Sequence, residues 1–287
     1  MSALLDYPAL LISGAGILGL LVGSFLNVVI LRIPPRLMAS FRKEAREFLE
    51  LPAADEPLPP GIVAARSACP KCGFQLRWYH NIPLLSFALL RGRCASCRAP
   101  ISWQYPLVEL LSALLIAACM WRFGPTWQFV FAALCTWLLL AMSFIDFRTH
   151  YLPDELTMPL IGLGLGAALF PLFVSPAQAI AGLLAGYLSL WLVYHAYKWI
   201  RNREGMGGGD FKLLAGLGAL LGAKPLLLLV LFASISGSIA GLVYLAIRRK
   251  DLPFAFGPYL AVAGWIMLLW GQPLMAWLTP TLSGPVG

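Results

Sequence analysis

Long apolar stretches, separated by short polar segments, run along most of the chain. A helix needs about 20 apolar residues to cross the ~30 Å hydrocarbon core of a bilayer. The pattern therefore predicts an all-α polytopic membrane protein with eight transmembrane helices. One long polar segment, residues 34–104, follows the first of them. The predicted spans are residues 8–33, 106–121, 127–145, 158–174, 177–200, 211–223, 226–247 and 258–278.

Composition and charge agree with a lipid environment. Hydrophobic residues make up 60% of the 287 positions and charged residues only 12%, which is typical of membrane proteins. The net charge of +8 would suit nucleic acid, but the basic residues gather in a few loops. Eleven of the 21 Lys and Arg residues lie between Arg32 and Arg98, which makes that segment cytoplasmic by the positive-inside rule. If successive loops alternate between the two sides of the membrane, only Arg122 and Lys224 of the Lys and Arg residues lie on the side away from the cytoplasm. Because the basic residues follow the membrane topology in this way, no nucleic-acid partner is expected.

The long polar segment divides the chain into three predicted parts. Residues 1–33 form the first transmembrane helix, residues 34–104 a small cytoplasmic domain, and residues 105–287 a seven-helix membrane core. Residues 36–51 place apolar side chains on one helical face. This helix either lies on the membrane surface or is solvated and packs on the module that follows it. The proline-rich residues 52–61 are typical of a linker.

Four of the six cysteines form two Cys-x2-Cys pairs with 21 residues between them: Cys69, Cys72, Cys94 and Cys97. Two such pairs place four thiolates around one zinc ion, and a reducing cytoplasm disfavours disulfides. Four protein ligands close the coordination shell, so the zinc is expected to organise the domain and not to catalyse. Unpaired thiols or a redox pair are the alternatives. Cys119 and Cys135 lie within spans and are interpreted as small packing residues.

Two aspartates, Asp146 and Asp210, lie at the cytoplasmic edges of their spans. Charged groups are costly beside lipid, so acids at this depth point to a function or to an ion pair. A glycine run that includes Gly207 and Gly209 precedes Asp210, and Lys212 follows it. Glycines permit positive φ angles and the close approach of another segment. We expect these three residues to support the loop that carries Asp210.

Two carboxylates close together suggest an aspartic protease. Like charges in one site cannot both ionise easily, so the pair shares a proton and can activate a water molecule against a peptide carbonyl. No Gly-x-Ser-x-Gly or His-Glu-x-x-His motif competes with this interpretation. The alternative is an ordinary ion pair with Arg148 or Lys212. A third acid, Asp154, is expected to cap the next helix.

The motifs together resemble the prepilin peptidases, a family of Gly-x-Gly-Asp intramembrane aspartyl proteases with a leader peptidase and an N-methyltransferase activity. The resemblance rests on the segments 23–29 (GSFLNVV), 81–83 (NIP), 105–109 (YPLVE), 146 with 152–154 (D and LPD), 207–210 (GGGD) and 256–259 (FGPY). It covers nearly the whole chain, and the four cysteines resemble those of the bifunctional branch.

The resemblance implies a multi-pass protein of the bacterial inner membrane whose active site faces the cytoplasm. Its substrates would be type IV prepilins or the pseudopilins of type II secretion, and Asp146 and Asp210 the catalytic pair. Methylation of the new N-terminal residue would use S-adenosylmethionine. Gly92 and Arg93 are candidates for that half-reaction, as is Glu109, for which a buried structural role is equally open. Alternatives of another class are an ion or solute transporter with a zinc-stabilised loop and a non-catalytic scaffold.

Overall fold

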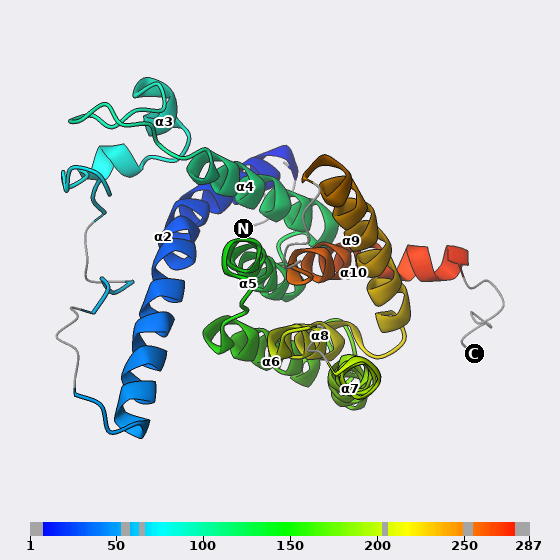
Figure 1. Ribbon diagram of the computed structural model, residues 1–287. Coiled ribbons are helices and arrows are strands. Elements are labelled where there is room, and N and C mark those ends of the chain that lie inside the picture. The colour runs from blue at the N-terminus through cyan, green and yellow to red at the C-terminus, as the bar shows by residue number, and fades with distance from the viewer. Residues whose placement is uncertain (1–7, 53–57, 63–66, 203–205, 249–254, 279–287) are drawn as a thin grey trace. The chain divides into compact units, whose positions relative to one another are not determined.

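The computed structural model describes residues 8–52, 58–62, 67–202, 206–248 and 255–278. Within these ranges the regular elements are helices, and pairing between extended segments is limited to isolated bridges (Figure 1). The all-α class predicted from the sequence is therefore confirmed. The chain forms two compact units, Met1–Trp121 and Arg122–Gly287, which are described separately below.

The first unit contains α2 (Pro8–Phe48), η1 (Trp78–Asn81), α3 (Leu85–Leu89) and most of α4 (Gln104–Phe123). Two glycines let α2 approach α4 closely. A Cβ atom at Gly19 would lie 2.7 Å from the Cα of Ala113, and one at Gly23 would lie 2.8 Å from the Cα of Glu109. Small residues are the usual means of packing membrane helices backbone to backbone.

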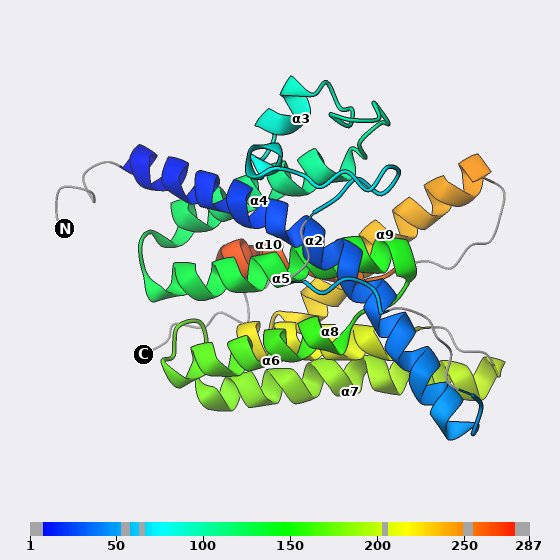
Figure 2. The same ribbon diagram turned by 90° about the vertical axis from the view of Figure 1, so that its left-hand side faces the viewer.

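The first helix continues past Ile33, where the hydrophobic pattern predicts its end, and runs on to Phe48 with Pro34 and Pro35 inside it. A proline removes one backbone N–H and crowds the preceding turn of a helix. Where the residues on both sides favour a helix, the result can be a bend and not an end. The ribbon of α2 changes direction part-way along its length (Figure 2). The residues after the prolines are mostly good helix formers, which carry the helix onward.

The predicted linker is partly described. Its residues 53–57 lie outside the described residues, whereas its end is bound to α2. Arg32 donates a hydrogen bond to the carbonyl oxygen of Gly61 at 2.6 Å, and Arg36 donates to that of Pro59 at 3.0 Å. The chain therefore turns back along the second half of α2 before it reaches the first cysteine pair.

The second unit contains six helices: α5 (Trp127–Thr149), α6 (Asp154–Leu169), α7 (Pro176–Arg201), α8 (Gly208–Leu221), α9 (Leu226–Arg248) and α10 (Gly257–Leu278). Among the described residues of both units, six helices are long and apolar enough to cross a membrane: α2, α4, α5, α7, α9 and α10. The sequence predicts eight spans. The other two coincide with α6 and α8, which have only 16 and 14 residues.

The short helix α8 is the centre of the second unit and lies between α6 and α7 (Figure 1). Glycines make this possible on both sides. The backbones of Gly182 in α7 and Gly218 in α8 approach so closely that neither position has room for a Cβ atom. Gly164 of α6 packs in the same way against Ala219. A helix too short to span the bilayer unaided is thus enclosed by longer neighbours.

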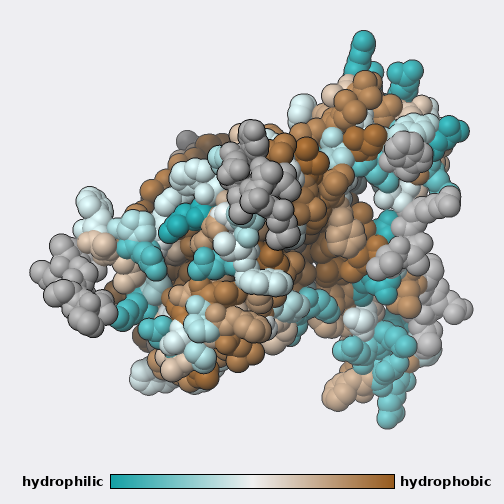
Figure 3. Space-filling model, turned by 180° about the vertical axis from the view of Figure 1, so that it is seen from behind, coloured by the Kyte–Doolittle hydropathy of each residue, from teal (hydrophilic) through white to brown (hydrophobic). Residues whose placement is uncertain are grey.

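The large apolar side chains of α7 face outward. Its buried residues are small apart from one leucine: Ala179, Gly182, Gly186 and Leu190. About half of the surface of each of four large residues, one helical turn apart, is exposed: Ile180, Leu184, Leu188 and Leu192. A helix of a water-soluble protein buries its large apolar side chains and exposes polar ones. The opposite arrangement in α7 is expected where lipid is the solvent. Apolar side chains make up much of the visible surface in Figure 3.

Candidate active site and cysteine cluster

Asp146 occupies the last turn of α5, with His150 as the left-handed residue that ends the helix. Its side chain is only 5% exposed. The Oδ2 atom accepts a hydrogen bond of 2.9 Å from the backbone N–H of Gly257, the first residue of α10. A Cβ atom at Gly257 would lie 2.7 Å from that oxygen, so only glycine allows this approach. The start of α10 thereby orients one face of the Asp146 carboxyl group.

Asp210 lies in the first turn of α8, and 7% of its surface is exposed. Leu152 connects its surroundings to those of Asp146. A Cβ atom at Gly209 would lie 2.6 Å from the Cβ of Leu152, and one at Gly257 would lie 3.2 Å from a methyl group of the same leucine. The two carboxyl groups are close enough to interact electrostatically. The structure therefore brings Asp146 and Asp210 into one site.

The free oxygen at this site belongs to Asp210. Among the described residues, no hydrogen-bond partner reaches its buried Oδ1 atom. An unpaired buried carboxylate oxygen is costly, and such groups are kept where a ligand or water completes them. The arrangement can therefore bind a polar group between an oriented carboxyl and one with an open oxygen.

The glycine run has a narrower role than its sequence indicates. None of Gly207, Gly208 and Gly209 has a positive φ angle, so the expectation of special backbone conformations is wrong for them. A Cβ atom at Gly207 or Gly208 would meet nothing within 4 Å. Only at Gly209 does a neighbour, Leu152, require the missing side chain. Gly207 serves as the residue before α8, with ordinary extended angles.

Lys212 binds a different acid from the one nearest to it in sequence. Its Nζ atom lies 2.7 Å from both carboxylate oxygens of Asp154. The prediction that Asp154 caps its helix is wrong, because Pro153 occupies the N-cap and Asp154 is the first residue of α6. Asp154 is the first residue of α6 and Lys212 the fifth of α8, so the pair joins the beginnings of the two helices. An ion pair between Lys212 and Asp210 is not what the structure contains.

The four predicted cysteine ligands come together in the first unit. The sulfur atoms of Cys69, Cys72, Cys94 and Cys97 all lie within 4.8 Å of one another, and those of Cys69 and Cys97 are 3.9 Å apart. Tetrahedral coordination with Zn–S bonds of ~2.3 Å places sulfur atoms ~3.8 Å apart. The cluster could hold one metal ion of that kind after small shifts of its sulfur atoms.

The two cysteine turns have the same backbone hydrogen bonds. Cys69 N–H donates to the carbonyl of Phe74, and Cys94 N–H donates to that of Ala99. In each turn the residue four positions after the first cysteine donates back to it, and that residue has a positive φ: 71° at Gly73 and 60° at Arg98. N–H groups of Cys72 and Lys71 lower the pKa of Cys69 to about 6. At Cys97 the N–H of Ala99 lowers the pKa, but desolvation and the other three thiols outweigh it and raise that pKa to about 11.

Comparison with known proteins gives the family. A model of the bacterial peptidase A24 N-terminal domain matches residues 17–123, and one of the type IV leader peptidase family matches residues 132–242. Proteins named prepilin leader peptidase/N-methyltransferase are similar over nearly all of the chain. That of Xanthomonas campestris is 48% identical over 96% of both chains.

The chain belongs to the type IV leader peptidase family.

Two further relatives of the same name agree. The Pseudomonas aeruginosa protein is 48% identical over 94% of this chain and 96% of its own, and the Neisseria gonorrhoeae protein 45% over 88% of both. No solved structure matches the chain. Membership in a leader peptidase family favours the peptidase interpretation of the aspartates over a transporter or a scaffold.

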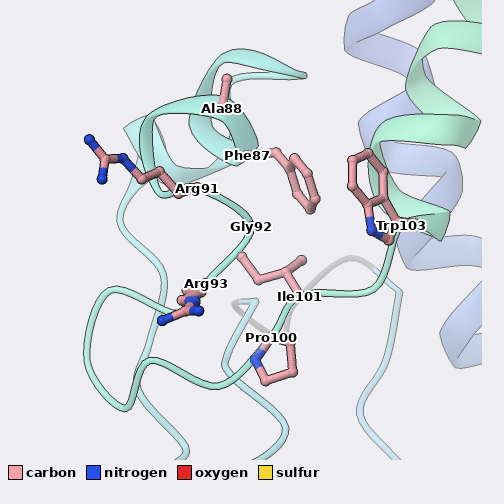
Figure 4. A pocket seen from close by; sticks show the side chains of 8 residues that line it. All are labelled: Phe87, Ala88, Arg91, Gly92, Arg93, Pro100, Ile101 and Trp103. Atoms are coloured by element: carbon pink, nitrogen blue, oxygen red, sulfur yellow. The ribbon is translucent and has the colours of Figure 1, made fainter.

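Two of the residues considered for methyl transfer line one cavity of the leader peptidase's first unit. Gly92 and Arg93 contribute to a space of about 480 Å³ beside α3. The rings of Phe87 and Trp103 are 5.0 Å apart, centroid to centroid, and Ile101 lies next to them (Figure 4). A Cβ atom at Gly92, whose φ is 67°, would come within 3.1 Å of the Phe87 ring. The cavity is therefore aromatic and apolar, with guanidinium groups near its edge.

The third candidate, Glu109, is placed elsewhere. Its buried carboxylate accepts a hydrogen bond of 2.8 Å at Oε2 from the backbone N–H of Leu84, the residue before α3. Leu84 has a positive φ of 57°, so this bond supports an unusual turn. This hydrogen bond gives Glu109 a buried structural role, which was one of two alternatives left open by the sequence. Whether Glu109 also binds substrate stays a prediction.

Gly257 and Leu152 were not identified as residues of the aspartate site in the sequence analysis. Both belong to motifs on which the family resemblance rests, FGPY and LPD. That resemblance alone does not say that Gly257 donates to Asp146 or that Leu152 fills the space beside Gly209. These contacts join residues 111 and 57 positions apart, and only the packed helices bring them together.

Proposed function

We propose that this member of the family removes the leader peptide of type IV prepilins by means of Asp146 and Asp210, and then methylates the new N-terminal residue. The observation that carries the proposal is the joint burial of these two carboxyl groups at one end of α5 and α8. The relatives' shared name supports both activities. Pseudopilins of type II secretion have the same chemistry at the cleavage point and are proposed as further substrates.

The geometry suggests how the pair works. With Oδ2 of Asp146 held by Gly257 and Oδ1 of Asp210 open, a water molecule can lie between the carboxyl groups. The ionised member takes a proton from that water as it attacks the peptide carbonyl. The protonated member donates to the carbonyl oxygen, where negative charge develops. The two titrate as a unit, so the roles are those of the pair.

The cysteine cluster is proposed to bind structural zinc. Four thiolates this close together can complete a closed tetrahedral site, which leaves no open position for a substrate. We propose that residues 34–104 form the zinc-organised cytoplasmic part and that residues 105–287 carry the peptidase. In this arrangement the protein lies in the bacterial inner membrane, with the aspartate pair toward the cytoplasm.

The cavity beside α3 is the proposed place of methyl transfer. S-adenosylmethionine supplies a methyl group on a positively charged sulfur. The rings of Phe87 and Trp103 suit both an adenine face and that cation, because aromatic faces attract positive charge. Arg93 can bind the carboxylate of the methionine part. Gly92 lets the loop pass close to the Phe87 ring, and Glu109 is proposed to receive the substrate's amino group through its Oε1 atom.

The test combines both half-reactions in one assay. Purified protein in bilayers is incubated with a prepilin and an isotopically labelled methyl donor, and mass spectrometry reads leader removal and methylation. Asp146→Asn and Asp210→Asn should each reduce cleavage by about a thousandfold or more. Glu155→Gln changes an exposed acid and should leave the rate within about twofold. Normal cleavage by either aspartate variant would contradict the mechanism.

A further inference from the structure

A second cavity, of about 650 Å³, lies within the second unit. It lies where α5, α7 and α9 begin and where α4, α6 and α8 end, beside the second half of α10. The aspartate pair lies at the other ends of α5 and α8. Along α5, Gln128 of the cavity and Asp146 are separated by roughly 27 Å at ~1.5 Å per residue. That distance is close to the thickness of a bilayer's hydrocarbon core.

The charge of this cavity is positive. Arg122 and Lys224 line it, and none of its described lining residues is acidic. These two are also the residues that the positive-inside rule leaves outside the cytoplasm. The other basic side chains described in the second unit lie at the aspartate end of its helices: Arg148, Lys198, Arg201 and Lys212. The only two cations described at this end of the unit thus meet in one cavity.

Arg122 is held in place and keeps donors free. Its Nε atom donates to the carbonyl oxygen of Leu269 on α10 at 2.7 Å, which fixes the side chain. Within the described part of the chain, no acceptor binds its terminal guanidinium nitrogens or the ammonium group of Lys224. The terminal N–H groups of a guanidinium and an ammonium group that line the same cavity suit the oxygen atoms of a phosphate.

The remaining walls are largely apolar. The rings of Phe123 and Phe173 meet edge to face with centroids 5.7 Å apart, and Met267, Leu268 and Met275 continue the surface along α10. A soluble anion would gain nothing from these walls. A ligand with a phosphate and hydrocarbon chains would bury both against matching groups, at the depth where a lipid headgroup meets its acyl chains.

We propose that this cavity binds an anionic phospholipid, with the phosphate group between Arg122 and Lys224 and the acyl chains against α10. The site is distinct from the aspartate pair and does not depend on the peptidase proposal. It places a lipid where the turn after α8 leads into α9. The bound lipid would therefore stabilise the end of α8, the helix whose first turn contains Asp210.

The experiment measures lipid binding without catalysis. Purified protein is titrated with phosphatidylglycerol, phosphatidylcholine or inorganic phosphate in mixed micelles, and retained lipids are counted by native mass spectrometry while the melting temperature is recorded. Wild type should prefer phosphatidylglycerol over phosphatidylcholine by at least about tenfold and gain thermal stability from it alone. Lys224→Gln should weaken that preference about fivefold, the usual effect of one basic residue near anionic lipid.

Matched variants decide the outcome. Arg201→Gln removes an exposed cation from the aspartate end and should leave the lipid preference unchanged. Arg122→Lys keeps the charge and should lose less than Arg122→Gln. Equal retention of the two lipids by wild type would overturn the proposal, and so would an undiminished preference in the Lys224→Gln, Arg122→Gln double variant. A full stabilising effect from inorganic phosphate alone would show a soluble anion site and would likewise contradict the lipid assignment.

Discussion

The aspartate site and the cysteine module are held together by different forces. At the aspartate site, three helix ends meet because glycines remove the atoms that would keep them apart, as at Gly209 and Gly257. In the cysteine module, two short turns with few buried apolar side chains converge on four sulfur atoms. The first depends on close packing, and the second is proposed to depend on a bound zinc ion. The two regions should therefore fail under different perturbations.

Metal removal should produce the largest difference between them. A structural zinc site contributes on the order of 10 kcal/mol to the folding of a small module, so chelation or Cys94→Ser should unfold residues 67–103. The helices of the second unit do not depend on that ion. We expect wild type to contain one zinc per chain, and chelated protein to expose new protease sites in the module while leader cleavage persists. A module that resists protease equally well without metal would contradict this assignment.

Packing at the aspartate site is tested by adding one methyl group. Gly209→Ala places a Cβ atom 2.6 Å from the Cβ of Leu152, so Leu152 and the start of α8 must shift. Displacement of a catalytic group by about an ångström costs on the order of a hundredfold in rate. We expect such a loss of leader cleavage from Gly209→Ala, measured at constant protein in the membrane.

The neighbouring glycine gives the matched control for that change. Gly208→Ala adds the same methyl group where nothing lies within 4 Å, and it should retain cleavage within about threefold. Leu152→Gly removes the clashing atom and should partly restore the Gly209→Ala variant. Equal losses from Gly208→Ala and Gly209→Ala would show that the glycine run acts through backbone flexibility and not through close approach.

Sequence patterns predicted which side chains come together in each region better than they predicted the contacts around them. The four cysteines could be assigned because their spacing alone restricts the geometry of a metal site. The two aspartates could be placed at one membrane edge because alternating spans fix which helix ends share a side. The partners of those aspartates could not be predicted, since a backbone N–H such as that of Gly257 leaves no mark in a hydrophobicity pattern.

The errors have physical reasons as well. The hydrophobic pattern ended the first helix at Ile33, but the two prolines that follow remove only two donors and the strong helix formers after them continue α2. Asp154 looked like a capping residue, yet it lies one position inside α6, where Lys212 of another helix reaches it. In the first case local helix propensity outweighs the prolines, because residues 41–48 of α2 are exposed. In the second case an ion pair with a neighbouring helix takes the side chain that a cap would use.

An aromatic change in the first unit should separate the two activities. Trp103→Ala removes one wall of the cavity beside α3 and should raise the KM for S-adenosylmethionine about tenfold, as expected for the loss of one stacking partner. Leader cleavage should be unchanged. Trp127→Ala alters an equally exposed tryptophan that lines neither cavity described above and is the control. A KM shift of the same size in both variants would argue against a methyl-donor site at this cavity.

The ion pair between Lys212 and Asp154 should have the smallest effect, and its sign is informative. The side chains are 30% and 52% exposed, so the pair contributes only about 0.2–1 kcal/mol to stability. Its position is more important, because it joins the beginnings of α6 and α8, one residue from Leu152–Pro153 and two from Asp210. Lys212→Gln should reduce leader cleavage about threefold with little change in melting temperature. The charge exchange Lys212→Asp with Asp154→Lys should recover part of that loss, because it restores attraction between the same two helix ends, whereas each single exchange places like charges together. If the double exchange is no better than the worse single change, Lys212 acts on the aspartate site by itself and not by tying α8 to α6.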